Sequence, residues 1–224
     1  MSIKKIIAFG SAKGGVGKSS ITASIALSLS KHKRVGILDA DIYGPNQNIL
    51  FNISSKNKIT NNLIQPAEVK NIKVISMGNI LNYDEAAIWR GPMLSGAIKK
   101  LIHKSNWGKL DYLLIDMPPG TGDPYLTIFK ELDVNEFILI STPNGLAISD
   151  SQKTISLLKK LNVNILGYIH NNIFNNNDFN MDFFNINDIK HLGTYIFDKN
   201  LHNFNCEYYS KVSNQISKII LSDV

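Results

Sequence analysis

The stretch Gly10-Ser-Ala-Lys-Gly-Gly-Val-Gly-Lys-Ser-Ser20 follows a short apolar run and precedes a segment with helical periodicity. A strand, a glycine-rich turn and a helix, in that order, are the context that a phosphate-binding loop requires. The usual pattern of this loop has glycine where this chain has Ala12, which is the smallest replacement. We therefore predict a P-loop here. The alternative is a glycine-rich turn with an incidental lysine.

The glycines of this loop have a direct chemical use. Residues without a side chain let the backbone turn so that successive N–H groups point inward at phosphate oxygens, and the helix that follows adds its positive N-terminal end. Lys18 would supply a point charge to the β and γ phosphates, and Ser19 would offer its hydroxyl to Mg²⁺. The predicted nucleotide-binding residues of the loop are Gly14, Gly15, Val16, Gly17, Lys18, Ser19 and Ser20.

Beyond the loop, short apolar runs alternate with stretches of helical periodicity. Runs without polar alternation are typical of strands that are covered on both faces, and their alternation with helices indicates βαβ units. The predicted strands are residues 6–9, 35–38, 74–76, 112–115, 137–140 and 165–169, and the predicted helices are residues 18–31, 93–104, 124–132, 147–161 and 207–221. We expect an α/β fold with a doubly wound, mostly parallel sheet and helices on both faces.

We expect residues 1–224 to form a single P-loop ATPase domain. Two connections are longer than an ordinary link between a helix and a strand. Residues 52–71 are polar and contain Pro66, and residues 171–190 form an Asn-rich insertion that also contains phenylalanine. Each is a candidate for a flap or a functional loop, and neither is long enough to be a domain.

Carboxylates follow two of the predicted strands. Asp116 ends one strand, and Asp39 and Asp41 follow another. Open α/β sheets bind ligands at the carboxyl edge of their strands, so these groups would face the loop if the strands are neighbours. Asp116 has the position of a Walker B aspartate. Of the other two, one would sit near the metal and the other would position the attacking water. The alternative is that these aspartates only cap turns.

Further segments carry a resemblance to a known family. The two lysines of Lys13-Gly-Gly-Val-Gly-Lys18 resemble the deviant Walker A motif of the MinD/ParA group of P-loop ATPases. Three further segments narrow the resemblance to one family within this group. They are Leu38-Asp-Ala-Asp-Ile-Tyr-Gly-Pro-Asn46, Trp89-Arg-Gly-Pro-Met93 and Asp111-Tyr-Leu-Leu-Ile-Asp-Met-Pro-Pro-Gly-Thr-Gly-Asp123. Together they closely resemble the Mrp/ApbC family of iron–sulfur cluster carriers, over about residues 4–170.

The resemblance implies roles for individual residues. Lys13 would reach across a homodimer to the partner's phosphates, Lys18 and Ser19 would act in their own subunit, and Asp41 would orient the hydrolytic water. Asn171 would contact the adenine, and residues 118–122 would form a switch. The predicted catalytic residues are thus Lys13, Lys18 and Asp41, and the predicted Mg²⁺ ligands are Ser19, Asp39 and Asp116. For Lys13 a solvated surface lysine is the alternative, and Asn171 stands in an Asn-rich stretch where it could be filler.

The chain departs from this family at its cysteines. The family carries a Cys-x-x-Cys pair shortly after the position of Asn171, one pair from each subunit, and this chain has none there. Its single cysteine is Cys206, so a homodimer offers two thiolates where a four-iron cluster usually takes four. His170, His191 and His202 are potential nitrogen ligands. Binding of an iron–sulfur cluster is therefore left open, with cysteine-bearing assembly or recipient proteins as expected partners.

Composition excludes several classes. Hydrophobic residues make up 44% and charged residues 19% of the 224 residues, which is typical of a packed globular protein. No apolar run reaches the length of about 18 residues that crosses a bilayer, and Met1 runs directly into a strand, so we expect a cytoplasmic protein without a membrane span. The net charge is +6, but only Arg34 and Arg90 among 24 basic residues are arginine. Because arginine is the usual residue for base and phosphate recognition, we expect no nucleic-acid partner.

Three functions remain. The first is a Mg²⁺-dependent ATPase that forms a homodimer and acts in iron–sulfur cluster assembly or transfer. The second is a MinD/ParA-like positioning ATPase that binds membrane or DNA, which would explain the missing cysteines. The third is a nucleotide-binding protein that has lost catalysis. The apolar face of the C-terminal segment, with Tyr208 and Ile216, favours packing on the sheet over a membrane-surface helix.

Overall fold

The computed structural model describes residues 2–80, 91–142, 145–172, 184, 187–196 and 211–222. Its strands are β1 (Ser2–Gly10), β2 (Val35–Asp39), β3 (Ile59–Thr60), β4 (Leu63–Ile64), β5 (Ala67–Val69), β6 (Ile72–Ser76), β7 (Lys109–Asp116), β8 (Glu136–Ser141), β9 (Asn164–Asn172) and β10 (His191–Ile196). Its helices are α1 (Lys18–Leu29), α2 (Gln47–Leu50), the short 3-10 helix η1 (Met77–Asn79), α4 (Gly91–Lys104), α5 (Asp123–Glu131), α6 (Gly145–Lys160) and α9 (Lys211–Ser222).

Eight strands form one sheet in the order β10-β9-β8-β1-β7-β2-β6-β5. All neighbours in it pair in parallel except β5, which pairs antiparallel with β6 and closes that edge. The remaining two strands, β3 and β4, form a small separate hairpin. The central position of β1 confirms the predicted doubly wound fold, because the chain winds outward from β1 in both directions.

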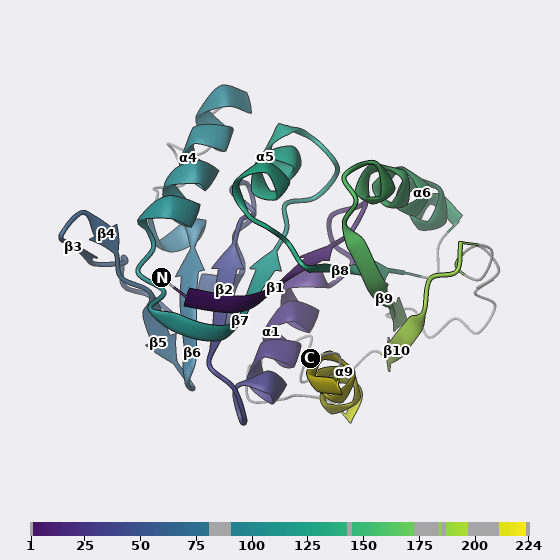
Figure 1. Ribbon diagram of the computed structural model, residues 1–224, viewed down its shortest axis with the longest axis horizontal. Helices are drawn as coiled ribbons and strands as arrows, with labels where there is room; N and C mark the ends of the chain where they lie inside the picture. Colours follow the sequence, from purple (N-terminus) through teal and green to yellow (C-terminus); the bar gives the residue numbers. More distant parts are fainter. Residues whose placement is uncertain are drawn as a thin grey trace.

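Helices cover both faces of the sheet (Figure 1). α4, α5 and α6 pack on one face, where Leu101, Ile128 and Leu158 join a core cluster with the side chains of that face. α1 and α9 pack on the other face, where Ile25 and Ile220 belong to a second cluster. The central strands are buried on both faces, which explains why they consist of continuous apolar runs.

α1 is buried more completely than a single inward stripe predicts. The sequence places Ile21, Ile25 and Leu29 toward the sheet, but nearly every residue of the helix is buried. α9 packs on its outer side, where Ser24 and Ser28 make hydrogen bonds of 2.5 and 2.7 Å to Ser213 and Asn214. The C-terminal helix therefore packs on the edge strand β10 of the sheet, as we expected, and also on α1.

All six predicted strands and all five predicted helices are present, with shifted ends. The sequence did not predict β3, β4, β5, β10 or α2. The polar connection 52–71 contains three of these short strands. Most of the Asn-rich insertion, together with Arg90, His202, Cys206 and Tyr208, lies outside the described residues.

Among the helices that the structure describes, none has both the length and the apolar character needed to cross a bilayer.

Candidate nucleotide-binding site

The predicted P-loop connects the carboxyl end of β1 to the first residue of α1. Gly15 and Gly17 have φ angles of +77° and +83°, which is the left-handed region that favours glycine. Gly17 is the N-cap of α1, and no side chain caps the helix there. The free N–H groups at this helix end therefore point toward the inside of the loop, where an anion is the natural partner.

The loop surrounds a cavity of about 300 Å³. Ser11, the P-loop and Pro119 line it, together with Asp41 and Asn46 from the segment after β2. A Cβ atom added at Gly14 or Gly15 would meet no atom within 4 Å, so the backbone borders open space at these two positions. The loop thus has the volume and the hydrogen-bond donors that the phosphate chain of a nucleotide requires.

The register of the sheet brings the predicted carboxylates to one place. Asp116 at the end of β7 pairs in register with Phe9 of β1 on one side and with Asp39 of β2 on the other. The strand carrying the P-loop is therefore the direct neighbour of the strand carrying Asp116. The expectation that the acidic residues and the loop meet at the carboxyl edge of the sheet agrees with this placement.

Lys18 and Asp116 form a buried ion pair. Lys18 Nζ lies 2.5 Å from Asp116 Oδ1, and the two side chains are 7% and 0% exposed. Burial lowers the pKa of Lys18, but the charge of Asp116 and its hydrogen bond outweigh this effect and raise the pKa overall. Lys18 is therefore held as a cation directly beneath the cavity.

Asp39 lies in a layer below the cavity and is fully buried. Its Oδ2 accepts hydrogen bonds from the backbone N–H of Gln47 at 3.0 Å and from the Ser76 hydroxyl at 2.8 Å. Burial and the neighbouring Asp116 carboxylate raise the pKa of Asp39 to about 7. Asp39 does not line the cavity as described, so its predicted role as a metal ligand stays a prediction.

Asp41 reaches the cavity itself. Its Oδ1 accepts a hydrogen bond from the backbone N–H of Gly44 at 3.0 Å, and the residue lines the cavity. Burial raises the pKa of Asp41, while the Gly44 N–H and the charge of Lys18 oppose the shift. The structure thus separates the two aspartates that follow β2, with Asp39 in the buried layer and Asp41 at the cavity.

Gln47 connects these parts, although no sequence motif singles it out. Its Nε2 donates to Asp116 Oδ2 at 2.8 Å and to the backbone carbonyl of Ser19 at 3.0 Å, and the side chain is fully buried. Gln47 therefore links α2 to the P-loop helix and to β7. No pattern in a single sequence marks a buried amide of this kind, because its partners come from distant segments.

Asn171 lies against the loop from the other side. Its Nδ2 donates to the backbone carbonyl of Val16 at 2.8 Å, and a Cβ atom at Gly17 would collide with this amide. The side chain therefore holds the P-loop backbone. The contact with adenine, which the family resemblance implies, stays a prediction.

Lys13 stands at the rim of the cavity. Its side chain is 39% exposed, and its Nζ lies 3.7 Å from Asp150 Oδ2, at the outer limit of an ion pair. Such a pair contributes little stability, so the lysine is available for another anion. Its predicted contact across a dimer needs a second subunit and stays a prediction.

Two further predictions concern metal ligands. His170 and His191 lie on the neighbouring strands β9 and β10. Within the described ranges, no group of three or more histidine, cysteine, aspartate or glutamate side chains is placed to hold a metal ion.

Comparison with known protein families shows to which family the chain belongs. A family model described as ParA, NUBPL iron-transfer P-loop NTPase, matches residues 2–210. An iron-sulfur cluster carrier protein of Rickettsia bellii is 47% identical over 171 residues, which are 75% of this chain and 54% of that protein. The iron-sulfur cluster transfer protein NUBPL of Dictyostelium discoideum is 43% identical over 173 residues, with the same two coverages. The chain spans about half the length of the curated relatives it matches.

Solved structures agree with the fold. A nucleotide-binding protein from Archaeoglobus fulgidus, in complex with ADP, has a TM-score of 0.77 and 29% identity, and the match covers 95% of this chain and 88% of that one. The septum site-determining protein MinD from Pyrococcus horikoshii, complexed with Mg-ADP, has a TM-score of 0.75 and 22% identity, with coverages of 98% and 96%. The MinD likeness supports the fold alone, whereas the more similar sequences are cluster carriers.

Proposed function

The chain belongs to the ParA family of NUBPL-type iron-transfer P-loop NTPases, and on that basis we propose that it binds and hydrolyses ATP with Mg²⁺ and acts in iron–sulfur cluster assembly or transfer. The observation that carries the nucleotide part is the cavity between the uncapped N-terminus of α1, Lys18 and Asp41. The observation that carries the cluster part is the set of relatives, which are named as cluster carrier and transfer proteins.

We assign the hydrolytic step to residues at the cavity. The terminal phosphate would draw Lys18 from Asp116, since a triphosphate offers more negative charge than one carboxylate. Asp41 would accept a hydrogen bond from the attacking water and orient it toward the phosphorus, whose bond to the leaving ADP oxygen then breaks. Mg²⁺, held by the Ser19 hydroxyl and by Asp39 and Asp116 directly or through water, would supply further neutralisation of charge.

We propose that catalysis requires two subunits. Lys13 lies at the open side of the cavity with a weak partner of its own, and a second P-loop lysine is useful where extra negative charge is neutralised as two subunits close. ATP is therefore expected to convert a monomer to a homodimer, as measured by light scattering. Lys13→Ala should bind ATP but remain monomeric. An ATP-dependent dimer of Lys13→Ala would contradict this assignment.

The cluster is cargo in this proposal. The chain has a single cysteine, Cys206, and two thiolates from a homodimer fall short of the four that a four-iron cluster usually takes. We therefore propose that a cysteine-bearing partner supplies the remaining ligands and that this chain acts as the nucleotide-dependent switch in the complex.

The test is anaerobic reconstitution followed by iron and sulfide analysis. Wild type and Cys206→Ala are each measured alone and with candidate cysteine-bearing partners, with and without ATP. We expect stoichiometric iron and sulfide only in the presence of a partner, and an ATP-dependent change in the amount transferred. Phosphate release without any cluster in either setting would leave the ATPase and remove the cluster role.

A further inference from the structure

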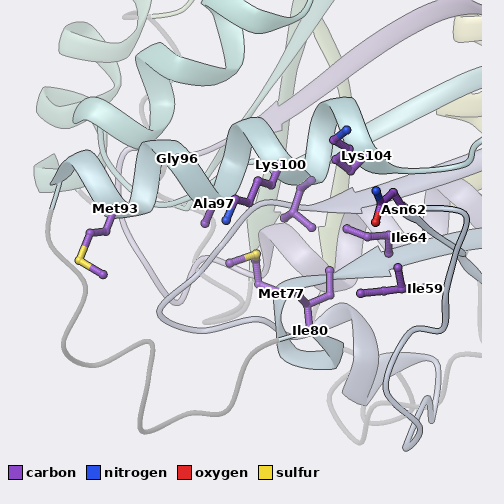
Figure 2. A pocket seen from close by; sticks show the side chains of 11 residues that line it. Ile59, Asn62, Ile64, Met77, Ile80, Met93, Gly96, Ala97, Lys100 and Lys104 are labelled. Atoms are coloured by element: carbon purple, nitrogen blue, oxygen red, sulfur yellow. The ribbon is translucent and has the colours of Figure 1, made fainter.

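A second, larger cavity lies away from the nucleotide site. It is a groove of about 960 Å³ between α4 on one side and the β3–β4 hairpin with η1 on the other. Figure 2 shows Met93 at one end of the α4 wall and Lys104 at the other, with Ile59 and Ile64 of the hairpin and Met77 opposite them. No residue that lines this groove also lines the cavity at the P-loop, so the nucleotide does not account for it.

The wall formed by α4 has the spacing of a helix-packing surface. The residues that line the groove from this helix are Met93, Gly96, Ala97, Lys100, Leu101 and Lys104. Steps of three and four residues place them on one face, and they span about 17 Å along the helix axis, or three turns. This face of α4 borders the groove, and a neighbouring face of the helix, with Lys99 and His103, packs toward α5.

The groove is open at its centre. Gly96 lies midway along the α4 wall, and a Cβ atom added there would meet nothing within 4 Å. Small residues at this point, Gly96 and Ala97, would let another backbone approach closely. The apolar side chains at the ends are exposed, with Ile59 at 71% and Met93 at 55%. Exposed apolar side chains gathered around one groove are typical of an interaction surface.

The described residues that line the groove carry charges of one sign. On the α5 side of α4, Glu131 pairs with Lys99 at 2.8 Å and with His103 at 2.7 Å. One residue further along the helix, Lys100 and Lys104 face the groove, and no carboxylate of the described residues forms an ion pair with either of them. Among the residues that the structure describes, those that line the groove include no acidic side chain. An occupant that carries acidic groups beside its apolar face would complement this edge.

From the apolar floor, the three-turn length and the two lysines Lys100 and Lys104, which no described carboxylate pairs with, we propose that this groove docks an amphipathic α-helix of a partner protein. The apolar side chains of that helix would fill the space above Gly96 between Met93 and Ile64. Acidic side chains on its flank, one turn apart, would pair with Lys100 and Lys104. An open groove of helical length fits a helix in the way that other helix-binding grooves do, whereas small-molecule sites enclose most of their ligand.

The test uses methionine-methyl NMR, because Met93 is exposed in the groove and Met77 lies in its buried floor, whereas Met117 is buried in the core and does not line the groove. The probe is a helical peptide of about 18 residues with leucines at helical spacing and glutamates on one flank. A matched peptide carries lysines in place of the glutamates. We expect saturable shifts of the Met77 and Met93 methyl signals with the acidic peptide, no shift of Met117, and affinity for the basic peptide lower by about tenfold or more.

Variants make the result specific. Lys100→Glu/Lys104→Glu should reverse the preference, so that the basic peptide binds more tightly than the acidic one. Gly96→Trp should abolish binding by filling the groove, while Gly96→Ala should retain it. Lys99→Gln, on the other side of the same helix, is the matched charge control and should bind like wild type. Circular dichroism of each variant checks that the fold is intact.

Two results would overturn the proposal. One is peptide binding that leaves the Met77 and Met93 signals in place. The other is an unchanged preference for the acidic peptide in Lys100→Glu/Lys104→Glu. Because the titrations contain no nucleotide and no cluster, their outcome is independent of the proposed ATPase and cluster functions.

Discussion

Lys18 Nζ lies 2.5 Å from Asp116 Oδ1, so the principal cation of the P-loop is paired with the carboxylate at the end of the neighbouring strand β7. Both side chains are buried, and Gln47 donates to the second oxygen of the same carboxylate. A buried ion pair of this kind contributes only modestly to the stability of the fold, but the removal of one partner is strongly destabilising because it leaves the other charge buried without a counter-charge. Nucleotide binding and stability are therefore linked through one ion pair.

The first prediction concerns that link. Lys18→Met should lower the free energy of unfolding by about 3–5 kcal/mol, because Asp116 would remain buried without its counter-charge. Lys18→Met/Asp116→Asn should recover most of that loss, since asparagine is neutral and still accepts from Gln47. Neither variant should bind ATP. Urea denaturation and titration with a fluorescent ATP analogue measure the two properties, and ATP binding by Lys18→Met would refute the assignment of the site.

The second prediction concerns Asp41. Asp41→Asn keeps an oxygen that can accept from Gly44 N–H, so the segment after β2 should hold its shape. The amide cannot take up a proton from the water or bind it as strongly. We expect the rate of phosphate release to fall by about 100-fold or more, with ATP affinity within a few-fold of wild type. Single-turnover hydrolysis is the measurement, and a rate equal to that of wild type would remove Asp41 from the mechanism.

The third prediction compares two glycines. Gly15→Ala and Gly17→Ala both place an alanine in the left-handed region, at a cost of about 1–2 kcal/mol each. Only the alanine at position 17 would also collide with the Asn171 amide. Gly17→Ala should therefore be the more destabilised variant and should lose more ATP affinity.

Relief by a second substitution checks the cause of that difference. Gly17→Ala/Asn171→Ala removes the colliding amide together with its hydrogen bond to Val16. The stability of the double variant should move back toward that of Gly15→Ala in thermal denaturation. If the double variant is as unstable as the sum of the two single ones, the close approach of Asn171 is not the reason.

The fourth prediction concerns the pH dependence of the free energy of unfolding, which we attribute to Asp111, a residue that does not line the nucleotide cavity. Both guanidinium nitrogens Nε and Nη2 of Arg34 donate to Asp111, at 3.0 and 2.9 Å, and Lys4 lies 2.9 Å from the same carboxylate. The hydrogen bonds from Arg34 hold the pKa of Asp111 well below its usual range. A depressed pKa contributes stability above the pKa of the unfolded chain, near pH 4, and this contribution is lost as the pH falls.

Asp111→Asn should therefore lower the free energy of unfolding by up to about 1 kcal/mol near pH 7, with solvent screening keeping the effect small. The difference from wild type should shrink as the pH falls toward about 3, and it should also shrink in high salt. Urea denaturation of both proteins across this pH range measures it. A difference that grows on acidification would have the wrong sign for a paired carboxylate.

The sequence predicted the central part of the fold because its signals are local there. Strands such as β2 and β8 are continuous apolar runs, and the turn after β1 is rich in glycine. The missed elements lack such signals. α2 has four residues, which is too short for a helical period, and in β10 the polar residues His191 and Thr194 interrupt the apolar run that marks the central strands.

The site was predictable to the extent that its residues lie at strand ends. Sheet register then brings Asp39 and Asp116 together without any further signal. What the sequence did not indicate is depth: Asp39 lies in a buried layer, while Asp41, two residues later, reaches the cavity. The position of Gln47 between Asp116 and Ser19 depends on how α2, α1 and β7 pack together, and this packing cannot be predicted from local sequence patterns.

The position of β1 in the sheet has a consequence for how the protein is made. Its two neighbours are β7 and β8, which begin at Lys109 and Glu136. The strand before the P-loop therefore has no partner in the sheet until about a hundred further residues have been synthesised. Parallel pairing at such sequence separation is slow to form. The nucleotide site is thus complete only after these distant strands have been made, and until then β1 exposes unpaired edges that favour aggregation.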